Sequence, residues 1–246
     1  FSRKNNILHF GKKIFELEWD IAKSSLSIGM GPFLMNAAAC IVNLFINQQL
    51  FKYGGDLSIG AYGLANRLTF FFLMIHMGLN QGMQPIAGYN FGAKQYSRVK
   101  EVFWATAKWM TLVAILCFIV SEFLPEPAIR IFTNDPELIS RSVNGIRLMN
   151  IAVFVVGFGM AAGNLFQCLG MVKTSIFLSL TRQLLFLVPL LYILPLLLGE
   201  SGVWYSFPIS DTISTFVALF FVLRFFRKFG KMKDGDDPSI LGGAIK

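Results

Sequence analysis

The chain has 246 residues, of which 54% are hydrophobic and only 15% charged, with a formal net charge of +8 at pH 7. Soluble domains are about a quarter charged, so this composition excludes an ordinary water-soluble globule and predicts an integral membrane protein with the lipid bilayer as its surroundings. The basic excess does not predict nucleic acid as a partner, because the Lys and Arg residues fall in short clusters between long apolar runs rather than on one soluble face.

Six apolar runs follow one another along the chain. A helix needs roughly 20 apolar residues to cross a bilayer, and Gly, Pro or charged residues separate runs of about this length. We predict spans at 24–50, 57–86, a third centred on 109–120 with an amphipathic approach from 95, then 148–169, 174–198 and 203–223. The polar stretch 122–137 between the third and fourth spans is expected to be an external loop without a buried core. The sequence therefore predicts an all-α membrane protein, a six-transmembrane-helix bundle.

The basic residues test this count of spans. With six crossings, both ends of the chain lie on one side, and sixteen of the 22 Lys and Arg residues fall on that side. Four fall on the other side, and Arg67 and Arg182 lie within spans. The positive-inside rule then predicts that both termini are cytoplasmic, in a multi-pass protein of the bacterial inner (cell) membrane.

Three parts of the chain are expected from this pattern. Residues 1–23 form a polar, basic cytoplasmic segment without the apolar core of a signal peptide. Residues 24–227 form the six-helix lobe, and 228–246 form a cytoplasmic tail. Because the first residue is Phe, we expect the chain to be a fragment of a longer protein or a processed product.

Asp211 is the only acid within the predicted spans. A carboxylate in the membrane is costly, so it is neutralised, paired or exposed to a wet cavity. Arg67 lies at a similar depth in the second span, which makes the two residues candidates for ion coupling, and Arg147 is a rival partner. The pair could change as transport proceeds, or it could be a fixed structural link between two helices.

Other polar residues in the spans allow a functional and a structural interpretation. Asn36, Asn43 and Asn47 follow a helical stripe, and with Asn80 and Gln84 they are candidates to line a water-filled cavity, although amides also hydrogen-bond between membrane helices. His76 could titrate or stay a hydrogen-bonded neutral ring. Arg182 is a candidate for a gating or structural role. Pro32 and Pro189 are candidates for the same roles, because prolines break helices.

No catalytic motif stands out. The three cysteines, Cys40, Cys117 and Cys168, lie inside apolar runs at spacings that fit no metal site. One Asp and one His are too few for an active site. We therefore expect no catalytic residue, no metal site and no organic cofactor. The protein is not expected to be an enzyme.

The stretch 78–94, Gly-Leu-Asn-Gln-Gly-Met-Gln-Pro-Ile-Ala-Gly-Tyr-Asn-Phe-Gly-Ala-Lys, resembles the multidrug and toxic compound extrusion (MATE) family, and most closely its bacterial multidrug branch. Three further stretches match the family in order. They are 46–56, Thr181-Arg-Gln183 with Pro189, and Gly202-Val-Trp204 with Pro208 and Asp211.

This resemblance implies a twelve-helix transporter built from two six-helix lobes, of which the chain looks like the second. It implies antiport of inward H⁺ or Na⁺ against outward drugs and organic cations, by alternating access, with the N-terminal lobe as partner. Some members place an acid in the first helix of this lobe. Here 24–50 has none, and Cys40 stands about where it is expected.

Two alternatives remain open. A lipid-linked oligosaccharide flippase of the same superfamily lines its cavity with several Arg and Lys, whereas only Arg67 and Arg182 lie within spans here. A non-transporting membrane scaffold, or a membrane-embedded enzyme, is the alternative from another class.

Overall fold

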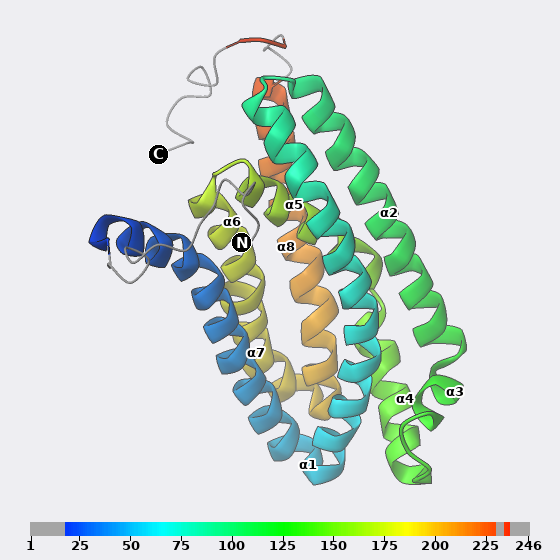
Figure 1. Cartoon of the computed structure of the whole chain (residues 1–246). Coiled ribbons are helices and arrows are strands. Elements are labelled where there is room, and N and C mark those ends of the chain that lie inside the picture. The colour runs from blue at the N-terminus through cyan, green and yellow to red at the C-terminus, as the bar shows by residue number, and fades with distance from the viewer. Residues whose placement is uncertain (1–17, 230–233, 237–246) are drawn as a thin grey trace, which may run out of the picture.

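The computed structural model describes residues 18–229 and 234–236, without the side chains at positions 24, 27, 28, 31, 32 and 172. Every regular element of this part is helical (Figure 1). Residues 1–17 of the predicted cytoplasmic segment, most of the predicted tail and the side chain of Pro32 lie outside the described part. The predicted boundaries between the three parts of the chain therefore stay predictions.

The helices follow one another with few interruptions. The elements are α1 (Trp19–Gly92), α2 (Tyr96–Phe123), α3 (Pro125–Arg130), α4 (Pro136–Asn150), α5 (Val153–Cys168), α6 (Val172–Leu180), the π-helical η2 (Thr181–Leu187), α7 (Val188–Leu198) and α8 (Glu200–Phe229). The described part confirms the predicted all-α fold.

Helix α1 is a hairpin of two legs rather than one long rod (Figure 1). Gly55 has φ 72° and ψ −167°, a conformation that glycine adopts without the penalty paid by other residues. The Tyr62 hydroxyl donates to Asn43 Oδ1 at 3.2 Å. On a straight helix these residues would be separated by roughly 28 Å at 1.5 Å per residue. The reversal at Gly55 therefore falls between the predicted spans 24–50 and 57–86.

Six passages result from these elements. Four helical stretches are long and apolar enough to cross a membrane, and α4 with α5, bent by 54°, forms a fifth. The first of the four is α1, and its reversal at Gly55 makes two passages of it. The others are α2, the broken run α6–η2–α7, and α8. The described residues therefore match the predicted order of spans.

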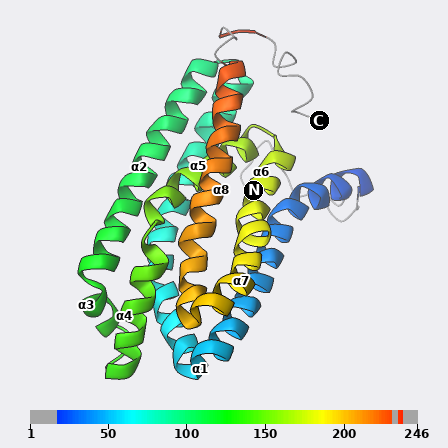
Figure 2. The same cartoon turned by 180° about the vertical axis from the view of Figure 1, so that it is seen from behind.

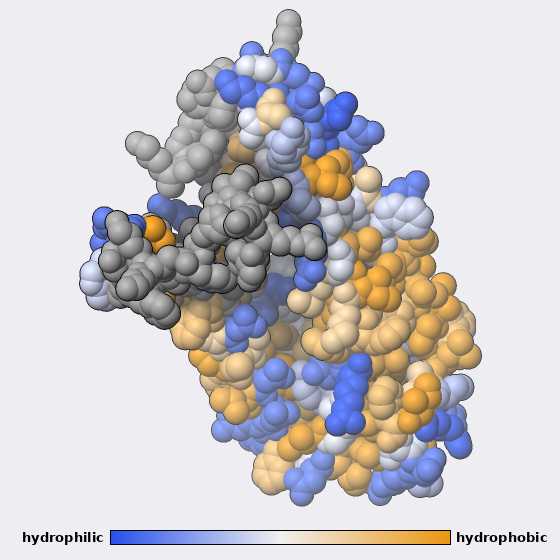
Figure 3. Space-filling model, viewed as in Figure 1, coloured by the Kyte–Doolittle hydropathy of each residue, from blue (hydrophilic) through white to orange (hydrophobic). Residues whose placement is uncertain are grey.

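Large apolar side chains cover the outside of the bundle. Leu197 is 76% exposed, Phe123 71% and Phe216 67%. Figure 3 shows hydrophobic residues gathered over the middle of the visible face. Exposed apolar surface of this extent is rare on soluble monomers, and it matches the hydrocarbon of a bilayer.

Two apolar cores fill opposite ends of the bundle. One packs Phe103 against Phe226 and Phe166 against Phe225, where α2, α5 and α8 lie together. The other surrounds Trp204 and Tyr62, where α8 begins and α1 turns back. Figure 2 shows α8 passing from one end to the other beside α5 and α7. Polar side chains are left to gather between these cores.

A polar network closes the end at which α1 reverses. Ser58 donates to Glu200 Oε1 at 2.6 Å, and Arg141 Nη1 lies 3.5 Å from Glu200 Oε2. Arg141 also donates to the carbonyl of Gly54 at 3.3 Å. The hairpin turn, α4 and the start of α8 are thereby joined.

One local expectation needs correction. The stretch 122–137 is not a loop without a core, because it contains α3, whose Pro125 and Ile129 are buried. Pro125 and Pro127 lie in the first turn of this short helix, where proline is compatible with helical structure.

Candidate functional site

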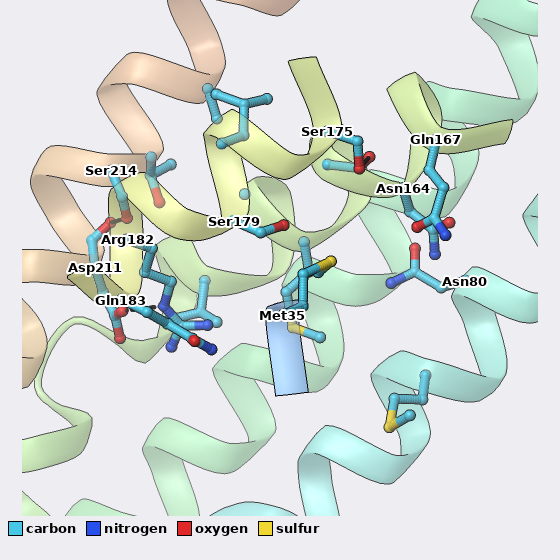
Figure 4. A pocket seen from close by; sticks show the side chains of 18 residues that line it. Met35, Asn80, Asn164, Gln167, Ser175, Ser179, Arg182, Gln183, Asp211 and Ser214 are labelled. Carbon is cyan, nitrogen blue, oxygen red and sulfur yellow. Dashed lines mark hydrogen bonds and ion pairs between the residues drawn. The ribbon is translucent and has the colours of Figure 1, made fainter. Parts of the chain in front are cut away.

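A cavity of about 330 Å³ lies between the cores, where α1, α5, α6, η2 and α8 meet. Its lining combines uncharged polar side chains with about as many apolar residues, three methionines among them (Figure 4). The lining residues are Met35, Met77, Asn80, Val156, Gly159, Met160, Gly163, Asn164, Gln167, Ser175, Leu178, Ser179, Arg182, Gln183, Asp211, Ser214, Thr215 and Ala218.

One ion pair lies in this cavity. Arg182 Nε donates to Asp211 Oδ1 at 2.6 Å. The Asp211 side chain is only 13% exposed and that of Arg182 is 38% exposed. The pair replaces the two partners expected from the sequence: Arg67 is exposed, and Arg147 donates to the carbonyl of Glu122. Similar depth did not identify the partner, because Arg182 faces Asp211 across the packed helices η2 and α8.

The π-helical turn η2 sets the position of Arg182. Pro189 cannot donate a backbone N–H to the carbonyl of Leu185, the bond that a regular α-helix would make there. The wider turn of η2 ends just before this proline. Ser210 on α8 donates to the carbonyl of Arg182 at 2.8 Å. Helix η2 is therefore joined to α8 through both the backbone and the side chain of Arg182, and π-helical turns recur at functional sites.

Two amide oxygens in the cavity lining lack partners within the described part of the chain. They are Asn80 Oδ1 and Gln183 Oε1, both buried. Asn80 as a whole is only 6% exposed. A buried acceptor without a donor costs about 1–3 kcal/mol. Both acceptors lie where a ligand or water could satisfy them.

Only some of the residues predicted to line a cavity do so. Asn80 lines the cavity, and Gln84, one turn further along α1, donates to the lining residue Asn164 at 2.7 Å. Asn36, Asn43 and Asn47 are not among the lining residues, and Asn43 instead accepts the Tyr62 hydroxyl. The first leg contributes Met35, next to Asn36.

Several lining residues escaped the sequence analysis. Asn164 and Gln167 lie on α5, while Ser175, Ser179 and Gln183 lie on α6 and η2. The signal was available, because Ser175, Ser179 and Gln183 recur every four residues. That spacing places them on one helical face.

His76 contacts two backbone carbonyls. Its Nδ1 lies 2.8 Å from the oxygen of Phe72, its Nε2 lies 3.0 Å from the oxygen of Met110, and the residue is 2% exposed. A neutral imidazole has one N–H and donates to one of them. His76 therefore lies at the contact between the second leg of α1 and α2, with Nε2 facing the carbonyl of Met110, next to the cavity residue Met77.

The cavity lies near the middle of the membrane passage. Asp211 is eleven residues from the start of the 30-residue helix α8, or roughly 16 Å at 1.5 Å per residue. A broken helix and an ionisable pair at this depth are typical of proteins that move solutes across membranes. The fold and the site thus define a multi-pass membrane protein of the transporter class.

The family follows from comparison with known proteins. The MatE family model matches residues 29–193. The chain belongs to the MatE family, and the resemblance predicted from residues 78–94 is confirmed. Members of this family are transporters, which sets aside the enzyme alternative.

Relatives similar to this chain are named as multidrug transporters. The multidrug export protein MepA of Staphylococcus haemolyticus is 26% identical over 222 residues, covering 90% of this chain and 48% of MepA. The solved MATE multidrug transporter DinF-BH is 36% identical, with a TM-score of 0.77, over 92% of this chain and 50% of that one. A MATE protein solved with MaL6 has a TM-score of 0.83 at 18% identity, over 94% of this chain and 53% of that one, and shows the fold alone. The chain spans about half the length of these relatives.

Proposed function

We propose that this chain forms one lobe of a transporter that exports drugs and organic cations in exchange for inward H⁺ or Na⁺. The second lobe, present in the longer relatives, completes the central cavity. The observation that carries the proposal is the Arg182–Asp211 pair inside a polar cavity at mid-membrane depth. Exchange then requires that cation and drug bind the inward-open and outward-open forms with different affinities.

Asp211 has the role of the coupling carboxylate in this proposal. Its second oxygen, Oδ2, remains for a proton, a metal cation or a cationic drug, while Oδ1 accepts from Arg182. Arg182 neutralises Asp211 when no cation is present, so the empty cavity carries no uncompensated charge. Arg67, exposed on α1, has no part in this step.

The lining argues against the flippase alternative. An anionic lipid-linked substrate requires several free cationic groups, and Arg182 is the only basic residue among the described lining. Its charge is already matched by Asp211. Methionines and amides instead suit substrates of varied shape, because the methionine side chain is flexible and polarizable.

Efflux in cells tests the proposal. The complete gene is expressed in a pump-deficient bacterium, and ethidium efflux is followed with a pH gradient or a Na⁺ gradient imposed. The proposal expects efflux that depends on one gradient and is lost in Asp211→Asn. Glu126→Gln, at an exposed position of α3, should retain it. Efflux by Asp211→Asn at the normal rate would remove Asp211 from the coupling step, and absence of efflux from a well-expressed protein would favour the flippase.

A further inference from the structure

The cavity contains two hydrogen-bond acceptors that nothing in the described part of the chain satisfies, Asn80 Oδ1 and Gln183 Oε1. Both residues line the same cavity. In Figure 4, Gln183 lies beside Arg182 and Asp211, whereas Asn80 lies beside Asn164 and Gln167, with Met35 between the two groups. The unsatisfied acceptors are therefore spatially separated.

The neighbouring amides leave both oxygens unpaired. Asn164 accepts from Gln84 through Oδ1, and its own donor, Nδ2, makes no hydrogen bond to Asn80 Oδ1. Gln183 follows Arg182 on η2, whose backbone is bonded to Ser210 and whose side chain is bonded to Asp211. These bonds fix the backbone of η2 next to Gln183, while both amide oxygens stay unpaired.

We infer that the cavity selects cations that carry N–H donors at two separated positions, over cations of similar shape without them. This inference rests on the proposed function for the cationic charge and adds the requirement for donors. A ligand of this kind would donate to Asn80 Oδ1 at one end and to Gln183 Oε1 at the other. Its apolar centre would contact the side chains of Met35 and Met160, which also line the cavity.

The size of the cavity fits this class. Small-molecule sites occupy about 300–1,000 Å³, and about 330 Å³ places this cavity at the lower end. A planar tricyclic dye with an amino group at each side meets the size limit. A ligand without donors leaves both acceptors buried and unpaired, and a site built to hydrogen-bond its ligand rejects analogues that lack the matching group.

A matched pair of dyes separates the donor requirement from charge and shape. Proflavine and acridine orange share one planar cationic ring system at neutral pH. Proflavine carries N–H donors on its two outer amino groups, which are fully methylated in acridine orange. Binding is measured by fluorescence anisotropy with the protein in nanodiscs of zwitterionic lipid. The readout is the ratio of the two dissociation constants, each corrected with empty nanodiscs for partition of the dye into lipid.

Three variants complete the test. Asn80→Leu and Gln183→Leu each remove one acceptor, and each is expected to reduce the preference for proflavine about tenfold, the value of one hydrogen bond to a charged ligand. Gln81→Leu, at the neighbouring exposed position on α1, should leave the ratio unchanged. Circular dichroism confirms that each variant is folded.

The outcomes separate the two proposals. A preference for proflavine that falls in both acceptor variants, in a protein that shows no efflux, supports the donor requirement and contradicts the transport function. Normal efflux with a ratio that is the same in the native protein and all variants overturns the donor requirement and leaves the transport function standing. An equal loss in Gln81→Leu would also overturn it, because the effect would not be specific to the cavity.

Discussion

Arg182 on η2 and Asp211 on α8 form an ion pair with 2.6 Å between Nε and Oδ1, inside a cavity lined mainly by uncharged groups. Removal of one partner leaves a charge with poor solvation, whereas removal of both leaves none. The stability of the lobe should therefore respond to the two residues together rather than separately.

A double-mutant cycle measures this coupling. Asp211→Asn and Arg182→Gln should each lower the free energy of unfolding by roughly 1–3 kcal/mol, and the double variant should recover part of the loss. Thermal unfolding in detergent, followed by circular dichroism, gives the values. Strictly additive effects would show that the pair contributes no interaction energy.

Close packing at Gly202 predicts an intolerant position. A Cβ added there would overlap the backbone of Leu194 and Pro195, and backbone has less freedom to move than a side chain. We expect Gly202→Ala to destabilise the lobe by about 2 kcal/mol or more. Gly63→Ala is the matched control, since its Cβ would meet nothing within 4 Å. It should raise stability by about 0.5–1 kcal/mol, the usual gain from Gly to Ala within a helix. Equal melting temperatures for the two variants would contradict the α7–α8 packing described here.

The contacts of His76 predict a structural effect. Substitution by Ala removes its hydrogen bond to a backbone carbonyl and opens a small cavity between α1 and α2. A loss of roughly 2–4 kcal/mol follows from hydrogen bonds and packing combined. His76→Gln, which retains one side-chain donor group, should lose less. Stability unchanged in His76→Ala would show that His76 does not tie these helices together.

A contact outside the membrane predicts a pH response. The Ser97 backbone N–H and hydroxyl donate to the Asp234 carboxylate at 3.0 and 2.6 Å, and Gly235 N–H donates to the carbonyl of Lys94 at 2.9 Å. The hydrogen bonds from Ser97 lower the pKa of Asp234. The pKa of Asp234 is therefore lower in the folded than in the unfolded chain, and the ionised carboxylate stabilises the folded state fully at a pH above the unfolded pKa. This stabilisation is lost as the pH falls through the pKa that Asp234 has in the folded chain.

Hydrogen exchange at the start of α2 tests this contact. The Ser97 amide should exchange faster, relative to its intrinsic rate, as the pH falls below the ordinary range for Asp. Asp234→Asn should give the faster relative rate at neutral pH as well. A control amide in the middle of α2, such as that of Met110, should not respond. Identical protection of Ser97 in Asp234→Asn and the native protein would contradict the contact.

The fold was predictable from sequence because its determinants are local. Apolar runs of membrane length, Gly55 at the first reversal and the clustering of basic residues each act within a short stretch of chain. The helix α3 was not predicted, because its formation depends on the burial of Pro125 and Ile129 by the rest of the bundle. The bend between α4 and α5 was not predicted either.

The site was predictable in part. Asp211, Arg182 and Asn80 were selected because polar groups in apolar runs are costly, and all three line the cavity. The pairing was wrong, since two residues at equal depth can face different directions around the bundle. Asn43 was a candidate either for the cavity lining or for a hydrogen bond between helices, and it bonds Tyr62 across the α1 hairpin. Helical periodicity predicts a common face but does not identify which helix packs against it.

Coupled flux in proteoliposomes decides whether Asp211 links drug export to a cation gradient. The complete protein is reconstituted with a pH-sensitive dye inside, and proton movement and ethidium movement are recorded together, with and without a Na⁺ gradient. Ethidium should move against a flow of H⁺ or of Na⁺, and Asp211→Asn should abolish both fluxes. Ethidium movement that is independent of both gradients, or coupling that survives in Asp211→Asn, would contradict the proposed role of this carboxylate.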